Sequence, residues 1–184
     1  MNSISIENQL KQVDDTLIHV GYVMEAGRKL IKELLKKGQE KQAMELLQRI
    51  MKHDYSKSSE SEFYGLSAFA DDVAALKDPT VNTVQDGKFQ TIRLHWKHND
   101  HHPEYWADQM PKSFVDETPL VINENMPDMA IAEMCCDWFA RSAQYKTNIW
   151  EFYEMRTKTR WKFTDKQHEL IQTYLTLLLS GSEE

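Results

Sequence analysis

Apolar side chains recur at helical spacing along the first part of the chain. They lie at positions 10, 13, 17, 20, 24, 31 and 34, and Gly38 follows. Steps of three and four residues place side chains on one face of an α-helix, and a glycine after the last apolar position is typical of a helix end. The sequence therefore predicts a helix over residues 6–35.

The remaining segments predict shorter helices joined by loops. Ser59 and Thr164 each precede a Glu or Gln by three residues, which is the capping box that marks many helix starts. Pro103 and Pro127 suit the first position of a helix. No run alternates apolar and polar residues in the way that predicts a strand. The further helices are expected at about 40–52, 59–76, 88–99, 127–146, 148–156 and 164–179, with loops over 78–87 and 111–125.

Size and charge narrow the class of protein. A chain of 184 residues with this pattern predicts one all-α domain over residues 1–184. Its formal net charge of −7 disfavours duplex nucleic acid and anionic membranes as partners, because both attract basic surfaces. We find no secretory signal and no apolar run of the ~20 residues needed to span a membrane. The only cysteines, Cys135 and Cys136, are adjacent and cannot join distant segments, so we expect a cytoplasmic protein.

Histidines are concentrated in one short segment. Four of the seven, His95, His98, His101 and His102, lie within eight residues. On a continuous helix, His95, His98 and His102 would share one face, and clustered imidazoles are typical ligands of divalent metal ions. If the helix ends before residue 100, His101 and His102 begin a new segment. The alternative is a polar surface at a helix–loop junction, so the pattern leaves open which of the four are ligands.

A consecutive His53-Asp54 pair follows the second predicted helix, and Lys57 comes three residues later. Where the backbone turns, adjacent imidazole and carboxylate groups can bind one cation. The ammonium group of Lys57 could then hold an anionic oxygen of a substrate. The dipeptide alone is weak evidence for such a site.

The predicted helix 127–146 is apolar nearly all round, which is typical of a helix in the middle of a bundle. Its polar residues Glu133, Asp137 and Arg141 recur every four residues and form one narrow stripe. Either this stripe is solvated, with Asp137 paired to Arg141, or it faces a polar cavity in which Asp137 binds a metal.

His19 lies off the main apolar stripe of the first helix and clusters with Val23, Ala26 and Leu30. A second apolar flank implies burial on more than one side, so we expect His19 in the interior. A buried histidine is more often hydrogen-bonded structure than a metal ligand.

In chain order, these residues resemble the ligand pattern of the HD-domain superfamily of metal-dependent phosphohydrolases. That all-α superfamily binds a divalent metal with a histidine, a consecutive His-Asp and a late Asp, and His19, His53-Asp54 and Asp137 match this order over about residues 15–145. Lys57 fits the HDxxK variant, which is similar to members that carry two metals. More narrowly, HDYSK, HWKHNDHHPEYW and MAIAEMCCDWFARS resemble a small family of HD-like phage and bacterial proteins.

The resemblance implies an HD-type helical bundle that binds one or two divalent ions (Mn, Co, Mg, Zn or Fe), with C-terminal helices at 148–179. It implies catalytic roles for Lys57 and His98, and metal ligands at His19, His53, Asp54, His95, His102 and Asp137. The expected reaction is hydrolysis of a nucleotide or another small phosphate ester by metal-activated water. Trp96, Tyr105 and Trp106 could form a wall on which a base stacks.

Two alternatives stay open at this point. The same ligand types would suit an HD-fold di-iron oxygenase. A bundle that binds a nucleotide or a partner protein without turning it over is the other alternative. The expected partners are a small phosphorylated substrate and a second copy of the chain in a homodimer.

Overall fold

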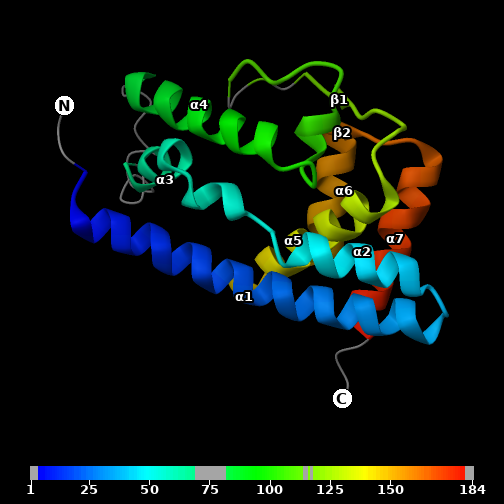
Figure 1. Ribbon diagram of the computed structural model, residues 1–184. Coiled ribbons are helices and arrows are strands. Elements are labelled where there is room, and N and C mark those ends of the chain that lie inside the picture. The colour runs from blue at the N-terminus through cyan, green and yellow to red at the C-terminus, as the bar shows by residue number, and fades with distance from the viewer. Residues whose placement is uncertain (1–3, 69–81, 114–115, 117, 181–184) are drawn as a thin grey trace.

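The longest element, α1 (Ile6–Lys36), runs along one side of the molecule in the computed structural model (Figure 1). The structure describes residues 4–68, 82–113, 116 and 118–180. After α1 the chain turns at Gly38, whose φ of +72° lies in the left-handed region that favours glycine, and α2 (Glu40–Ile50) packs back against α1. Gly27 lets the two helices approach closely, because a Cβ atom there would lie 2.7 Å from Cγ1 of Ile50. The first two predicted helices are confirmed.

The central helix is α5 (Asp128–Tyr145), as its apolar sequence predicts. Residues 129–138 are all buried, and α5 packs against α1, α2, α6 (Ile149–Thr159) and α7 (Asp165–Ser180). The second capping box forms at the start of α7, where Gln167 Oε1 accepts from the Thr164 amide at 2.9 Å and Thr164 Oγ1 accepts from the Gln167 amide at 3.3 Å.

Two helices, α3 (Glu60–Ser67) and α4 (Asn82–His98), lie over the N-terminal half of α1, whereas α2 lies along its C-terminal half (Figure 1). A short 3-10 helix, Tyr55–Ser58, leads into α3. A second one, Pro103–Trp106, follows α4 and has its proline at the predicted first position. The part of the predicted helix 59–76 beyond residue 68 lies outside the described residues.

The prediction of a loop over 78–87 is wrong for residues 82–87, which belong to α4. Asp86-Gly87 is a common turn signal, but a glycine inside a helix costs only about 1 kcal/mol. The rest of α4 is packed: Phe89 is buried, and its ring contacts that of Trp96 at a centroid distance of 6.2 Å. Tertiary packing therefore outweighs the local preference for a turn.

The expectation of no strand is also wrong, because β1 (Leu120–Val121) and β2 (Trp161–Lys162) form a parallel pair. Leu120 pairs with Trp161, and the Leu120 amide donates to the Arg160 carbonyl at 2.7 Å. Trp161 also stacks on Trp138 of α5 at a centroid distance of 5.1 Å. Two residues per strand are too few to show an alternating pattern in the sequence.

Of the seven α-helices of the described residues, five contribute to one hydrophobic core: α1, α2, α5, α6 and α7. The prediction of a single all-α domain is confirmed. Among the described helices, none is long and apolar enough to cross a membrane.

Candidate metal centre

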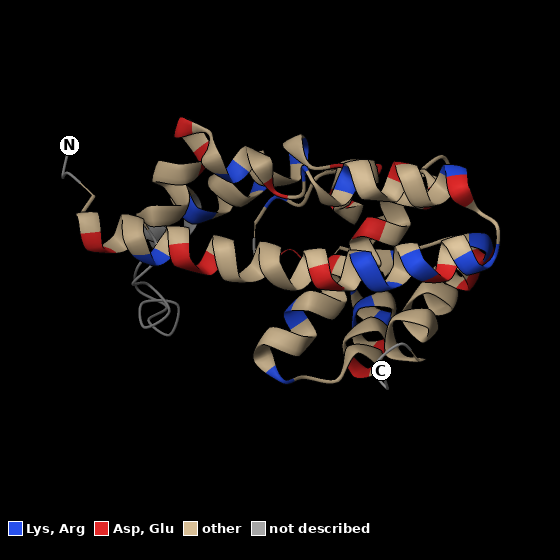
Figure 2. Ribbon diagram, turned by 60° about the horizontal axis from the view of Figure 1, so that its bottom comes forward, with Lys and Arg blue, Asp and Glu red and all other residues tan. Residues whose placement is uncertain are grey.

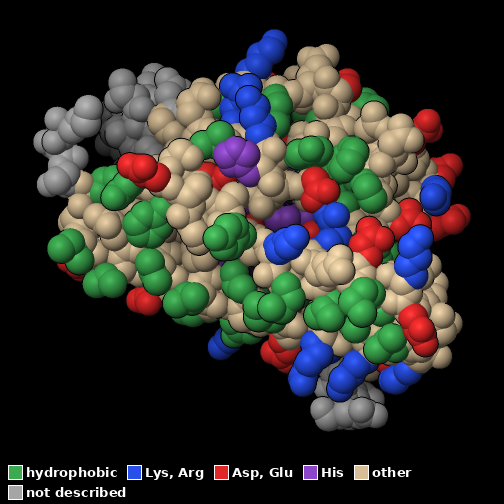
Figure 3. All heavy atoms as spheres, in the orientation of Figure 1, with side chains coloured by type: hydrophobic (Ala, Val, Ile, Leu, Met, Phe, Trp, Pro, Cys, Tyr) green, Lys and Arg blue, Asp and Glu red, His purple; other side chains and the backbone are tan. Residues whose placement is uncertain are grey.

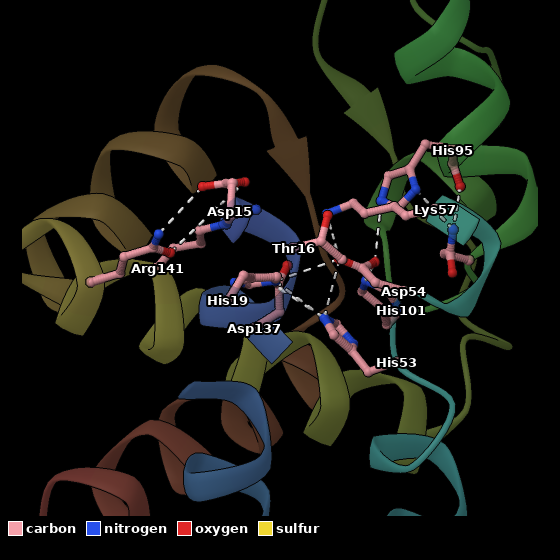
Figure 4. A network of polar contacts seen from close by, with 12 residues as sticks. Asp15, Thr16, His19, His53, Asp54, Lys57, His95, His101, Asp137 and Arg141 are labelled. Carbon is pink, nitrogen blue, oxygen red and sulfur yellow. Dashed lines mark hydrogen bonds and ion pairs between the residues drawn. The ribbon is translucent and has the colours of Figure 1, made fainter. Parts of the chain in front are cut away.

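The chain changes direction at His53-Asp54, directly after α2. Asp54 adopts a left-handed conformation with φ 57° and ψ 17°, which costs a residue with a side chain roughly 1–2 kcal/mol. The turn directs both side chains into the same interior space (Figure 4), where His53 is 5% and Asp54 is 3% exposed. A strained backbone that buries two ionisable groups is typical of a functional site.

Four side chains from α1, this turn and α5 form a first group of ligand atoms, which we name site A. Nε2 of His19 lies 3.0 Å from Oδ1 of Asp137 and 3.5 Å from Oδ2 of Asp54. It also lies 3.3 Å from Nε2 of His53. Ligands held about 2.1 Å from one cation lie roughly 3.0–3.4 Å from one another. The spacing in site A is therefore close to that of a metal-binding site.

A second group of ligand atoms gathers around Oδ1, the other oxygen of Asp54, and we name it site B. Nε2 of His95 lies 3.3 Å from this oxygen and 2.9 Å from Nε2 of His102. Nε2 of His101 lies 3.7 Å from the same oxygen. Because α4 ends at His98, His101 and His102 begin a new segment that folds back beside His95. Asp54 thus offers one oxygen to each site.

Two buried glutamates orient the imidazole rings of both sites. Oε1 of Glu133 lies 2.9 Å from Nδ1 of His53 and 3.3 Å from Nδ1 of His101. Oε2 of Glu62 lies 2.9 Å from Nδ1 of His95. An ionised carboxylate only accepts hydrogen bonds, so each Nδ1 carries the proton. When a ring of this kind binds a metal through Nε2, its Nε2 lone pair faces the ligand groups, which is the arrangement common around protein-bound metal ions.

The cluster leaves several buried polar atoms without a hydrogen bond among the described residues: Nδ1 of His19, Oδ1 of Asp54 and Nε2 of His101. Two of these atoms, from Asp54 and His101, belong to site B. A buried polar atom without a partner costs about 1–3 kcal/mol. A divalent cation would satisfy both atoms in site B at once, so the donor set fits a metal centre. Every predicted metal ligand lies in sites A and B.

The carboxylates of the cluster are held in their ionised form. Burial by itself would raise the pKa of Asp54, Glu133 and Asp137. Hydrogen bonds and Coulombic attraction from the surrounding histidines outweigh burial and hold the pKa values of all three carboxyl groups well below the usual range. At Asp54, Lys57 lowers the pKa further, because its Nζ lies 2.6 Å from Oδ2. Ionised carboxylates are the form that binds cations.

The histidines fall into two classes by charge. Burial lowers the pKa of His19 and His102, so these rings are neutral. Burial also opposes charge at His53 and His95, but the neighbouring carboxylates outweigh it and raise the pKa of both rings. Protons therefore compete with a cation at His53 and His95 more than at the other two.

Glu62, Glu133 and His101 were not predicted as site residues. Glu62 was assigned to a capping box with Ser59, but the Ser59 side chain makes no capping hydrogen bond, and Glu62 binds His95 and His98 instead. Glu133 was visible only as part of the polar stripe of α5. His101 was one of four clustered histidines, and no sequence signal separated it from its neighbours.

His98 lies apart from sites A and B. Its side chain is 45% exposed, and its Nδ1 lies 2.5 Å from Oε1 of Glu62. It lines a different cavity, together with residues that include Arg49, Lys52 and Glu133. The predicted catalytic role of His98 remains a prediction.

The polar stripe of α5 faces the cluster, so its description as a solvated stripe is wrong. Glu133 is 4% and Asp137 is 8% exposed. The cation of the stripe, Arg141, pairs with Asp15 of α1 at 3.7 Å (Figure 4).

A cavity of about 240 Å³ opens onto both sites. Its polar lining combines ligands from sites A and B with Lys57 and Arg141. Its apolar lining consists of Leu66, Ile92 and Trp96. Tyr105 and Trp106 are not part of this lining, so only one of the three predicted stacking residues faces the cavity.

Fold and site define an all-α, single-domain protein with a buried histidine–carboxylate cluster that could hold metal ions. The chain belongs to the family of unknown function DUF5662, whose family model matches residues 8–177. Searches of curated proteins and of solved structures gave no match.

Proposed function

We propose that the protein is a cytoplasmic, metal-dependent phosphohydrolase that acts on a nucleotide or another small phosphate ester. The observation that carries this proposal is the position of Asp54 between two groups of histidines. Its Oδ2 belongs to site A and its Oδ1 to site B, so one carboxylate can bridge two cations. The HD-domain resemblance implies the same ligand order.

Bound divalent ions would lower the pKa of a coordinated water from 15.7 toward about 7 and polarise a phosphoryl oxygen. Site A would hold one ion through His19, His53, Asp54 and Asp137. Site B would hold a second through Asp54, His95, His101 and His102. Glu62 and Glu133 keep the lone pairs of the ligand rings directed inward, so they are positioning residues.

Two cationic side chains reach the cavity from different elements. Lys57 is 9% exposed, and its ammonium contacts Asp54, so it can neutralise charge on a phosphate close to the ligand groups. Nη1 of Arg141 donates to Gln144 at 3.1 Å and to Tyr145 at 3.3 Å, and Arg141 forms one partly exposed ion pair, of 3.7 Å, with Asp15. Such pairs are weak, and a guanidinium group can bind two oxygens of one phosphate.

The size and the walls of the cavity favour a small ester. Ligand cavities for drug-sized molecules usually have about 300–1,000 Å³, and this one has about 240 Å³. Leu66, Ile92 and Trp96 offer an apolar wall to the organic part of the substrate, and Trp96 has a ring on which a base can stack.

The test is phosphate release from a panel of nucleotides and simple phosphomonoesters in Mn²⁺, Co²⁺ or Mg²⁺. The wild-type chain should release phosphate, and His53→Ala and Asp54→Ala should abolish release. His168→Ala is the control, because His168 pairs with Tyr153 through Nδ1 at 2.7 Å and belongs to neither site. Full turnover by either site variant would overturn the assignment of the site.

Two further measurements separate the alternatives. Tight nucleotide binding without product after long incubation would favour a binding protein. Iron with a visible absorption band after anaerobic purification would favour the di-iron oxygenase. Both results would contradict the proposed hydrolase.

A further inference from the structure

Arg49 is the one charged residue of α2 whose side chain is mostly buried. This helix carries basic and acidic residues along its length (Figure 2), and Glu40, Lys41 and Glu45 are exposed. The side chain of Arg49 is only 18% exposed. A guanidinium group is always charged and keeps its five donors in a fixed plane, so its burial requires acceptors in matching positions. The acceptors of Arg49 therefore indicate what this side chain holds in place.

Both acceptors come from other elements of the fold. Nε of Arg49 donates to Oε2 of Glu133 on α5 at 2.9 Å, and Nη2 donates to Oδ1 of Asp100 in the segment that follows α4. In the sequence, Glu133 is 84 and Asp100 is 51 residues away from Arg49. One planar group thus joins α2, α5 and the segment after α4.

Asp100 directly precedes His101 and His102, two members of site B. Two contacts anchor Asp100 to the rest of the domain. Its carboxylate accepts from Arg49, and its carbonyl accepts from Nε1 of Trp106 at 2.6 Å. A connecting segment without such anchors has many backbone conformations, and ordering it costs conformational entropy. The contact with Arg49 therefore helps to fix the position from which both rings reach site B.

The second contact of Arg49 acts through Glu133. Because Oε2 of this carboxylate accepts from Arg49, Oε1 is left to accept from the rings of two ligands, from Nδ1 of His53 at 2.9 Å and from Nδ1 of His101 at 3.3 Å. The side chain of Glu133 is 5% exposed, so water has little access to replace a lost partner. Arg49 therefore holds the orientation of a carboxylate that in turn orients one ring of each site.

We propose that Arg49 is a positioning residue of the metal centre, which assembles site B by holding Asp100 and Glu133 together. This inference rests on the proposed function, since it assumes that both sites bind divalent cations. Arg49 makes no hydrogen bond to a ligand of either site among the described residues. It lines the cavity that His98 also lines, on a face where histidine, basic and acidic side chains lie side by side (Figure 3).

The two sites should depend on Arg49 to different degrees. Site A is connected to Arg49 only through Glu133, whereas site B is connected through both carboxylates. Loss of Arg49 should therefore weaken metal binding at site B more than at site A.

The test is the affinity of the metal-free full chain for Mn²⁺, measured by titration calorimetry. The wild-type chain should bind two ions, and Arg49→Met should weaken the ion of site B about 10- to 100-fold, the usual effect of losing an outer contact. In a His102→Asn background, in which only site A remains, Arg49→Met should have a smaller effect. Lys41→Met is the matched control, because Lys41 is an exposed basic residue of the same helix.

A second variant, Asp100→Asn, keeps the proposal testable if Arg49→Met does not fold. The side chain of Asp100 is 39% exposed, and this variant leaves the ion pair between Arg49 and Glu133 in place. It should weaken site B and leave site A unchanged. The visible absorption of bound Co²⁺, which reports on ligand geometry rather than on stability, should change with it.

The outcomes separate this inference from the proposed function. Wild-type affinity for two ions in Arg49→Met and in Asp100→Asn, with an unchanged Co²⁺ spectrum, would overturn the role of Arg49 and leave the proposed hydrolase untouched. A wild-type chain that binds no ion would overturn both.

Discussion

The carboxylate of Glu133 accepts a hydrogen bond from Nδ1 of His53 at 2.9 Å, and this contact turns Nε2 of the same ring toward site A. Glu133 also contacts His101 of site B, and it accepts from Nε of Arg49 at 2.9 Å. One glutamate therefore orients one ring of each site without belonging to either. Loss of such an outer contact usually weakens metal binding about 10- to 100-fold.

We expect Glu133→Gln to lower the affinity for Mn²⁺ or Zn²⁺ by roughly that factor while the chain stays folded. Titration calorimetry measures the affinity, and circular dichroism checks the fold. Glu154→Gln is the matched control, because Glu154 is exposed, pairs with Lys158 at 3.2 Å and belongs to neither site. An unchanged affinity in Glu133→Gln would show that the glutamate does not orient the ligands.

Lys57→Met should slow phosphate release by about 10²–10³-fold, since removing one charge-stabilising donor from an active site has this effect. Lys57 is not a metal ligand, so the metal content should be unchanged. Steady-state kinetics and elemental analysis of the same sample separate the two effects. Lys52→Met is the control, because Lys52 is exposed and lines the other cavity. A loss of rate that follows a loss of metal would contradict the assigned role.

Metal-induced stabilisation should grow as the pH rises. In the folded chain the pKa of His53 and of His95 is above the usual value of 6.5. Without metal, these rings stabilise the fold fully below pH 6.5, and this contribution is lost as the pH rises through their folded pKa. A cation binds the deprotonated rings, so it competes better at higher pH.

The measurement is the difference in Tm between Mn²⁺-loaded and chelator-treated protein from pH 6 to pH 8. This difference should increase across the range. A constant or decreasing difference would show that His53 and His95 do not bind the metal.

Replacing either of two glycines of α1 by alanine should change the free energy of unfolding, in opposite directions at the two positions. At Gly21 an added Cβ would meet nothing within 4 Å, so Gly21→Ala should stabilise the protein by about 0.5–1 kcal/mol through helix propensity. At Gly27 the added Cβ would lie 2.7 Å from Ile50, and overpacking of this kind costs about 1–3 kcal/mol. Denaturant unfolding measures both. Equal effects would mean that the α1–α2 contact is looser than the structure shows.

The sequence predicted those features that depend on local periodicity or on one rare residue type. These features depend only on residues that are close in the sequence, and the structure confirms them: the helical spacing of α1 and α2, the apolar character of α5 and the capping box at Thr164. The interior position of His19 followed from its apolar neighbours in the same way.

Features that depend on distant contacts could not be read from the pattern. Glu62 fits a capping box as well as it fits a contact with His95, and only the packing of α3 on α4 separates the two. β1 and β2 are 39 residues apart and only two residues long. The apolar spacing of α1 shows the same limit: it predicts a helix, but Leu10 and Leu17 of this stripe are exposed, so the spacing does not tell which face the domain buries.

The central claim is that Asp54 joins two cation sites, and metal stoichiometry tests it most directly. Elemental analysis after loading with Mn²⁺ or Zn²⁺ and removal of free metal should give two ions per wild-type chain. Asp137→Asn should lose the ion of site A, His102→Asn the ion of site B, and Asp54→Asn both. Two ions retained in Asp54→Asn, or none in the wild-type chain, would contradict the account.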